Sequence, residues 1–181
     1  MYNKYEGKTL ILREVGDPAL RNKCYDVDIN NIDETTLNDI KDMKKTLDYT
    51  GGFGIAAPQI AINKNIIIIQ VDKKKCKYND SEDIPTTVMI NPSWKKTSDD
   101  TDIEYEGCLS VPSISGKVER YKNIEVTYYN ENGEKIIKEV KGFTARDIQH
   151  ECDHLKGIVF IDKVVNNEFA TKKAINKFEL K

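Results

Sequence analysis

A continuous run of β-branched residues in the first half of the chain is the feature that most limits the fold. Residues 65–71 read NIIIIQV, with four isoleucines in succession. A strand with one face in water would alternate polar and apolar residues, so this run predicts a strand that is buried on both faces. With 181 residues, the chain is long enough to bury the core that such a strand needs.

Three segments have the character of helices. Over 36–50 apolar residues recur at the helical period, Asp33 or Thr35 can cap the start, and a glycine pair follows the end. Residues 144–155 form a second helical segment, which a glycine ends two residues later. The tail from Asn167 is expected to form a third helix at the C-terminus.

The remaining patterns predict short strands and turns. Asn132-Gly133, flanked by 123–129 and 134–140, is a strong hairpin signal. Further short strands are expected at 10–12, 86–91 and 158–161, a turn at Asp17-Pro18, and an exposed loop over 72–85. Strands gather in the middle of the chain and helices lie apart from them. We therefore expect an α+β fold in a single domain over residues 1–181, with mixed or antiparallel sheets packed around a central helix that carries both histidines, and with an N-terminal and a C-terminal helix.

Composition and charge narrow the class of protein. The chain is 39% hydrophobic and 32% charged, and 28 basic against 30 acidic residues give a net charge of −2. This balance argues against nucleic acid as the main partner, and no apolar run is long enough to span a membrane. Without a recognisable export signal, the four separated cysteines are expected to be reduced. We expect a bacterial cytoplasmic protein, or an organellar one if a transit peptide has been removed.

The only two histidines of the chain lie four residues apart, in His150-Glu151-Cys152-Asp153-His154. On a helix this spacing puts both imidazoles on one face, where they can bind one metal ion. Glu151 follows the first histidine and can act as a general base on a water at the ion. The pattern therefore favours a metal-dependent hydrolase.

A catalytic ion of this type needs a third protein ligand and one open position. Phe160 stands where the metzincin pattern would need another histidine, so that pattern fails. Glu168 is a second candidate, although it comes only 14 residues after His154. Cys108, beside Gly107 at an expected strand end, is the third, although such a cysteine is more often a small core residue. The spacing alone leaves the last two candidates open.

Three motifs together resemble those of the peptide deformylase family, in the same order and without gaps. They are Gly52–Gln59 (GFGIAAPQ), Glu106–Ser110 (EGCLS) and Gln149–His154 (QHECDH), and the Asp17–Arg21 segment (DPALR) near the start fits as well. The form EGCLS is similar to that of the bacterial and organellar subgroup of this family. The resemblance covers nearly the whole chain, and three intact motifs are far more specific than any one of them.

The resemblance implies an amide hydrolase that removes the formyl group from the N-terminal formyl-methionine of nascent polypeptides and releases formate. Cys108, His150 and His154 would be the metal ligands, and Glu151 would be the general base. The resemblance implies one divalent ion, natively Fe²⁺, with Zn²⁺, Ni²⁺ or Co²⁺ as substitutes. It also implies a monomer.

The resemblance further assigns residues to the substrate. The Gln59 side chain and the Leu109 backbone N–H would donate to the formyl oxygen, and the Gly54 backbone would accept from the substrate amide. The residues expected to bind the substrate are Gly52, Phe53, Gly54, Gly107, Phe143 and Arg146. For Phe143 ordinary core packing is an equally good interpretation.

The lysines at the C-terminus allow two interpretations, a solvated helix face or a contact with the ribosome. Lys172, Lys173, Lys177 and Lys181 cluster there, and the simplest interpretation is a solvated helix face. In some deformylases a C-terminal helix docks to the ribosome, so this basic helix is a hypothetical ribosome contact. Two other functions remain as alternatives: a zinc endopeptidase that uses Glu168, and a non-catalytic, ribosome-associated metal-binding module.

Overall fold

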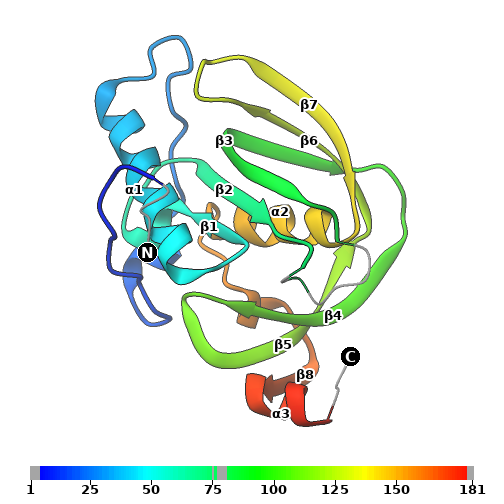
Figure 1. Ribbon diagram of the computed structural model, residues 1–181. Coiled ribbons are helices and arrows are strands. Elements are labelled where there is room, and N and C mark those ends of the chain that lie inside the picture. Colours follow the sequence, from blue (N-terminus) through cyan, green and yellow to red (C-terminus); the bar gives the residue numbers. More distant parts are fainter. Residues whose placement is uncertain (1–4, 75, 77–80, 179–181) are drawn as a thin grey trace.

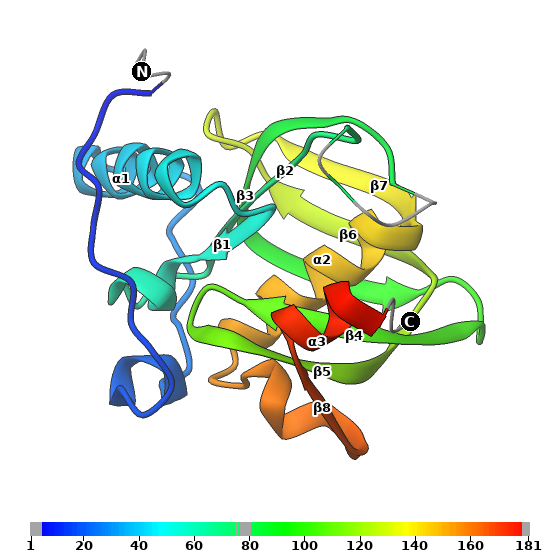
Figure 2. The same ribbon diagram turned by 60° about the horizontal axis from the view of Figure 1, so that its bottom comes forward.

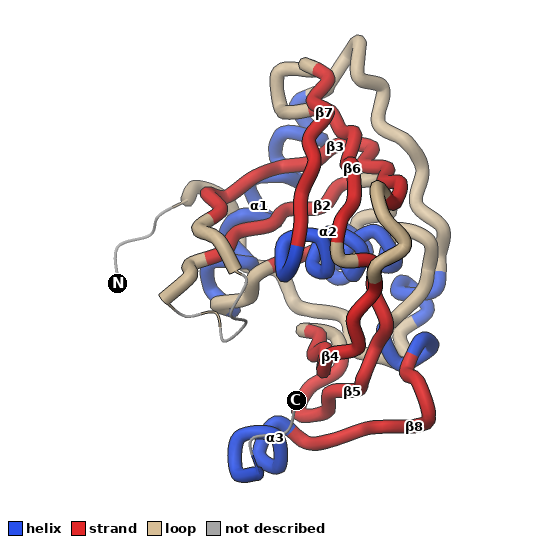
Figure 3. The backbone as a smooth tube through the Cα atoms, turned by 90° about the vertical axis from the view of Figure 1, so that its right-hand side faces the viewer, coloured by secondary structure: helices blue, strands red, loops and turns tan. Residues whose placement is uncertain are grey.

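The computed structural model describes residues 5–74, 76 and 81–178, and it has an α+β fold (Figure 1). A five-stranded antiparallel sheet has the order β1-β2-β3-β6-β7, and a three-stranded antiparallel sheet has the order β4-β5-β8. Helix α2 lies between the two sheets (Figures 1 and 3). The strands are β1 (Gly54–Ala56), β2 (Ile66–Val71), β3 (Ile84–Lys96), β4 (Thr101–Cys108), β5 (Val111–Tyr121), β6 (Asn123–Tyr129), β7 (Lys135–Lys141) and β8 (Val164–Thr171). The helices are α1 (Glu34–Thr50), α2 (Gly142–His154) and α3 (Lys172–Phe178).

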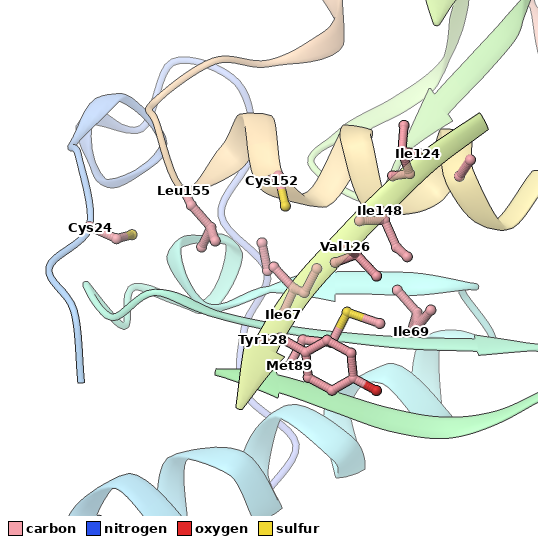
Figure 4. Packing of buried hydrophobic residues seen from close by; sticks show 12 residues of the cluster. Cys24, Ile67, Ile69, Met89, Ile124, Val126, Tyr128, Ile148, Cys152 and Leu155 are labelled. Carbon is pink, nitrogen blue, oxygen red and sulfur yellow. The ribbon is translucent and has the colours of Figure 1, made fainter. Parts of the chain in front are cut away.

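The isoleucine run forms β2, and both of its faces are buried as predicted. Ile67 and Ile69 point into a cluster with Ile148 and Cys152 of α2 (Figure 4). Their neighbours Ile66 and Ile68 point the other way, into a cluster that α1 covers. Because successive side chains of a strand face opposite sides, one apolar run anchors both helical layers.

Local signals explain where α1 begins and ends. The Asp33 side chain accepts a hydrogen bond from Thr36 N at 2.7 Å, so Asp33 is the N-cap and Thr35 is not. Gly51 ends the helix in the left-handed conformation, with φ 67°, and its N–H donates to Leu47 O. The predicted hairpin is also confirmed, with β6 and β7 paired on either side of Asn132-Gly133.

Two of the expected strands are wrong. Residues 10–12 form no ladder, because Leu10 N donates to the Thr46 hydroxyl and Arg13 N donates to Gln59 O instead. Residues 158–161 lead into a 3₁₀ helix, Phe160–Lys163, where the Asp162 side chain accepts from Val159 N at 2.9 Å. In both segments, side chains take backbone bonds that a neighbouring strand would otherwise supply.

The C-terminal tail also differs from the expected single helix. Its first part is strand β8, which pairs with β5 from Val118↔Val164 to Ile114↔Thr171, and only then does α3 begin. At the other boundary, Ile84 and Pro85 belong to β3 and not to the loop expected over 72–85. Residues 75 and 77–80 of that loop, like Lys181, lie outside the described residues. No helix among the described residues is long and apolar enough to cross a membrane.

Replacing Ile68 by alanine should lower the free energy of unfolding by about 2–5 kcal/mol, because the side chain is fully buried and its loss leaves a cavity. Denaturant unfolding measures this change. Ile11→Ala removes the same atoms from a residue that is 81% exposed, and it should change stability by no more than about 0.5 kcal/mol. Equal effects of the two substitutions would contradict this account of the core.

Candidate metal centre

Three potential metal ligands converge from two elements. Cys108 is the last residue of β4, and His150 and His154 lie one turn apart on α2. All three are buried, and their ligand atoms lie within 4.8 Å of one another. The Cys108 Sγ is 3.2 Å from His154 Nε2, and the two imidazole rings are 5.1 Å apart between centroids. The predicted meeting of a thiol with both imidazoles is therefore present in the fold.

A bulge aims the cysteine at the helix. Gly107 pairs with Ser115, but the next residue, Cys108, pairs with Val111, so β5 carries additional residues between these two partners. Among them is Ser113, which has a positive φ of 68°. Such bulges bend a strand locally and redirect its side chains. Here the bulge closes β4 and β5 into a tight turn whose first residue is Leu109.

Glu106 fixes the orientation of the first histidine. Its Oε2 lies 2.9 Å from His150 Nδ1, which leaves the other ring nitrogen, Nε2, for an ion. The same carboxylate accepts from Arg120 Nε and Nη2, each at 2.9 Å, and from Arg146 Nη1 at 2.7 Å. Burial would raise the pKa of Glu106, but the hydrogen bonds from Arg120 and His150 hold this pKa well below its ordinary value.

The donor set fits one divalent ion. Burial would raise the pKa of the Cys108 thiol, but the two imidazoles beside it hold this pKa well below its ordinary value, which favours the thiolate that binds metals. A thiolate with two imidazoles suits zinc, iron and other first-row ions. Among the described residues, no fourth side chain joins the group, as a closed structural site would require.

Glu151 lies beside these ligands on α2 and is almost fully buried. Its Oε2 has no hydrogen-bond partner among the described residues, and burial raises the pKa of its carboxyl well above the ordinary value. The carboxylate packs directly against β1. A Cβ atom at Gly54 would lie 2.5 Å from Glu151 Oε1, so only glycine at position 54 allows this contact.

The Gln59 side chain also reaches the metal ligand Cys108. Its Oε1 accepts from Ala56 N at 2.8 Å, which holds the amide in place. The Nε2 then lies 3.4 Å from Cys108 Sγ and 3.2 Å from Ser110 Oγ. The short 3₁₀ helix Ala57–Ile60 that follows β1 carries this side chain.

One cavity of about 340 Å³ brings the expected site residues together. It is lined by all the residues predicted for metal, catalysis and substrate except His154. Phe53 and Phe143 meet edge to face, with ring centroids 5.3 Å apart. Arg146 lines the cavity, but its guanidinium is held by Glu106, by Asp102 and by the carbonyl of Val118.

The residues of the cavity wall that were not predicted are Thr50, Gly51, Glu106, Asp147 and Lys172. Asp147 is buried, its Oδ2 has no partner in the described structure, and burial raises its pKa to about 7. Lys172, the first residue of α3, lines the mouth. An acidic residue three positions before His150 on a helix was a signal for Asp147. No local signal could have placed Lys172, because its position follows from the pairing of β8 with β5.

The alternative ligand Glu168 is not part of the centre. It lies on β8, half-exposed, and its Oε2 is 3.0 Å from Lys117 Nζ. This ion pair, in a segment that forms a strand and not a helix, explains why the glutamate does not reach the histidines. Without Glu168, the zinc endopeptidase alternative has no third metal ligand.

An α+β fold in which a thiolate and two imidazoles converge beside a buried glutamate defines a metal-dependent hydrolase. The family model described as polypeptide deformylase matches residues 10–170, and the chain belongs to the peptide deformylase family. The peptide deformylase of Pseudothermotoga lettingae is 39% identical over 165 residues, which cover 91% of this chain and 88% of that protein.

Solved structures agree with this assignment. A peptide deformylase from Synechococcus elongatus in complex with actinonin has a TM-score of 0.78 and 37% identity, covering 92% of this chain and 85% of that one. A Met-Ala-Ser-bound class I type b peptide deformylase from Acinetobacter baumannii has a TM-score of 0.81 and 33% identity, covering 88% of this chain and all of that one.

Cys108→Ala should remove most of the bound metal, because it deletes one of three ligands, whereas Glu168→Ala should leave the metal content unchanged. Metal analysis of the purified, dialysed variants measures both. Retention of metal by the cysteine variant together with loss by the glutamate variant would identify Glu168 as the third ligand and reverse our assignment.

Proposed function

We propose that this chain removes the formyl group from N-terminal formyl-methionine of nascent polypeptides and releases formate. The observation that carries the proposal is the convergence of Cys108, His150 and His154 within 4.8 Å in a cavity that Glu151 and Gln59 also line. Membership of the peptide deformylase family supports the same reaction.

The three ligands would hold one divalent ion. Such an ion lowers the pKa of a water to about 7 and polarises a carbonyl oxygen. We propose Fe²⁺ as the native ion, with Zn²⁺, Ni²⁺ or Co²⁺ as substitutes, since a thiolate with two imidazoles accepts each of them. A thiolate donates more charge than an imidazole and weakens the Lewis acid, so the protein must supply additional help.

Glu151 and Gln59 supply that help in our proposal. Glu151 accepts a proton from the attacking water at a carboxylate oxygen and delivers it to the amine that leaves. The Gln59 Nε2 and the Leu109 backbone N–H donate to the formyl oxygen as negative charge develops on it; one such donor is typically worth about 3–4 kcal/mol. Both residues line the cavity next to Cys108, which supports these roles.

The peptide would bind as an added strand. β1 is the edge strand of the five-stranded sheet, so an extended substrate can pair with its backbone near Gly52 and Gly54. Backbone pairing tolerates many sequences after the first residue. We assign the methionine side chain to the apolar wall of Phe53 and Phe143, with the aliphatic part of Arg146. The Met-Ala-Ser complex of the Acinetobacter relative supports a peptide in this cavity.

Glu151→Ala should lower kcat for formate release from formyl-Met-Ala-Ser by about 10²–10⁴-fold, because it removes the carboxylate next to the metal ligands that moves the proton. The assay uses reducing, oxygen-free conditions, and metal content is measured for each preparation. Glu139→Ala, an exposed glutamate on β7, is the control and should keep full activity. A wild-type protein that contains metal but releases no formate would refute the proposed function.

We also propose that residues 1–181 act as one catalytic domain and as a monomer in the cytoplasm. The position of α2 between both sheets supports a single domain. The ribosome is the proposed site of action, because Lys173 and Lys177 give the described part of α3 a basic surface outside the cavity wall.

Reversing both charges, Lys173→Glu with Lys177→Glu, should weaken co-sedimentation with ribosomes by roughly tenfold at moderate salt, because two contacts to phosphate become repulsive. This double variant leaves the β8–β5 pairing intact, which a truncation of the tail would remove. The matched control reverses Lys135 and Lys138, two exposed lysines of β7. Equal retention of wild type and both variants would exclude docking through α3.

A further inference from the structure

The C-terminal segment contributes a side chain to the catalytic cavity. Lys172 lines the cavity mouth with Gly107 and Leu109, although it follows His154 by a 3₁₀ helix and the whole of β8. No other residue of β8 or α3 within the described chain lines this cavity. Helix α3 packs against β5 and β8, and β5 pairs with β4, the strand that carries Cys108 (α3 is red in Figure 2).

The backbone holds Lys172 in this place from both sides. The two preceding residues, Ala170 and Thr171, are the last in the β8–β5 ladder, paired with Ser115 and Ile114. The Thr171 hydroxyl then accepts from Ala174 N at 3.1 Å and ties down the first turn of α3. The backbone of Lys172 is therefore fixed in position, and only the end of its side chain can move.

The lysine side chain runs beside Gly107 of β4. A Cβ atom at Gly107 would lie 3.5 Å from Lys172 Cε and 3.3 Å from Ser115 Oγ. The Cε atom of Lys172 therefore lies beside β4 at Gly107, one residue before the ligand Cys108. Because Lys172 is exposed and also lines the cavity, its ammonium group lies where the cavity opens to solvent.

The charge of Lys172 is free for a ligand. Within the described residues its ammonium group makes no ion pair, whereas the nearby Lys117 is bound to Glu168 at 3.0 Å. The other cationic side chain of the cavity wall, Arg146, is occupied by Glu106 and Asp102. An anionic group of a ligand would therefore find its available cationic partner at Lys172.

We infer that Lys172 is a substrate-positioning residue that favours nascent peptides with an acidic side chain shortly after formyl-methionine. The inference rests on the proposed deformylase function. An extended peptide advances about 3.3 Å per residue, so its next residues leave the cavity at the mouth while the formyl group lies at the metal centre. A partly exposed ion pair there strengthens peptide binding without touching the reacting atoms.

The test compares three amide-capped peptides, formyl-Met-Ala-Glu, formyl-Met-Ala-Gln and formyl-Met-Ala-Lys, by formate release at low and high salt. For the wild type, kcat/KM should fall in that order, by about two- to fivefold from the first to the last, through KM and not kcat. Lys172→Glu should reverse the order, and Lys172→Gln should abolish the discrimination. The preference should shrink at high salt because the charges are solvent-screened.

Lys173→Glu is the matched control, since it makes the same charge change on the same helix outside the cavity wall. It should keep the wild-type order, and the neutral Gln peptide should keep its kcat in every variant, which verifies the fold of each. An unchanged order in Lys172→Glu, or an equal reversal in Lys173→Glu, would overturn the inference. Failure of the wild type on all three peptides would instead refute the deformylase function on which it rests.

Discussion

The hydrogen bonds to the Glu106 carboxylate are the interaction on which the centre depends. One oxygen accepts from Arg120 Nε and Arg146 Nη1, and the other from Arg120 Nη2 and His150 Nδ1. These donors come from β5 and α2, and Glu106 itself lies on β4, two residues before Cys108. The small sheet, which supplies the thiol, is thereby joined to the helix that supplies both imidazoles.

A buried network of this kind is costly to form and more costly to break. The free-energy cost of desolvating the charged side chains can exceed the gain from their mutual attraction, so the network does not by itself indicate high stability. Removal of one partner, however, leaves an uncompensated buried charge and lowers the free energy of unfolding by about 3–5 kcal/mol. Arg120 extends the network to Asp153, which Lys163 also binds at 3.0 Å. What the network determines is the relative position of β4 and α2, and this sets the distance between the thiol and the imidazoles.

Much of the fold followed from local signals, and the exceptions share a physical cause. β2, the β6–β7 hairpin and the end of α1 each depend on their own residues, a β-branched run, Asn-Gly and a glycine. β8 depends on a partner strand more than forty residues earlier in the chain, which its own sequence does not encode. The same holds for the site. The motifs predicted which residues meet, but not that Glu106 orients His150 or that Lys172 reaches the mouth.

Helix α2 explains why the core and the centre form together. A helix buried on every side is normally apolar throughout. In α2 one side, with Ile148 and Cys152, packs on the five-stranded sheet, and the opposite side carries both imidazoles. Glu151 lies between these two sides, against Gly54 of β1. Gln149 fixes the helix along its axis, since its amide donates to Tyr121 O at 2.8 Å and accepts from Tyr121 N at 3.1 Å. A shift of α2 that moved the ligands away from Cys108 would also break these bonds and separate the isoleucines of the core, so the stability of the fold maintains the geometry of the centre.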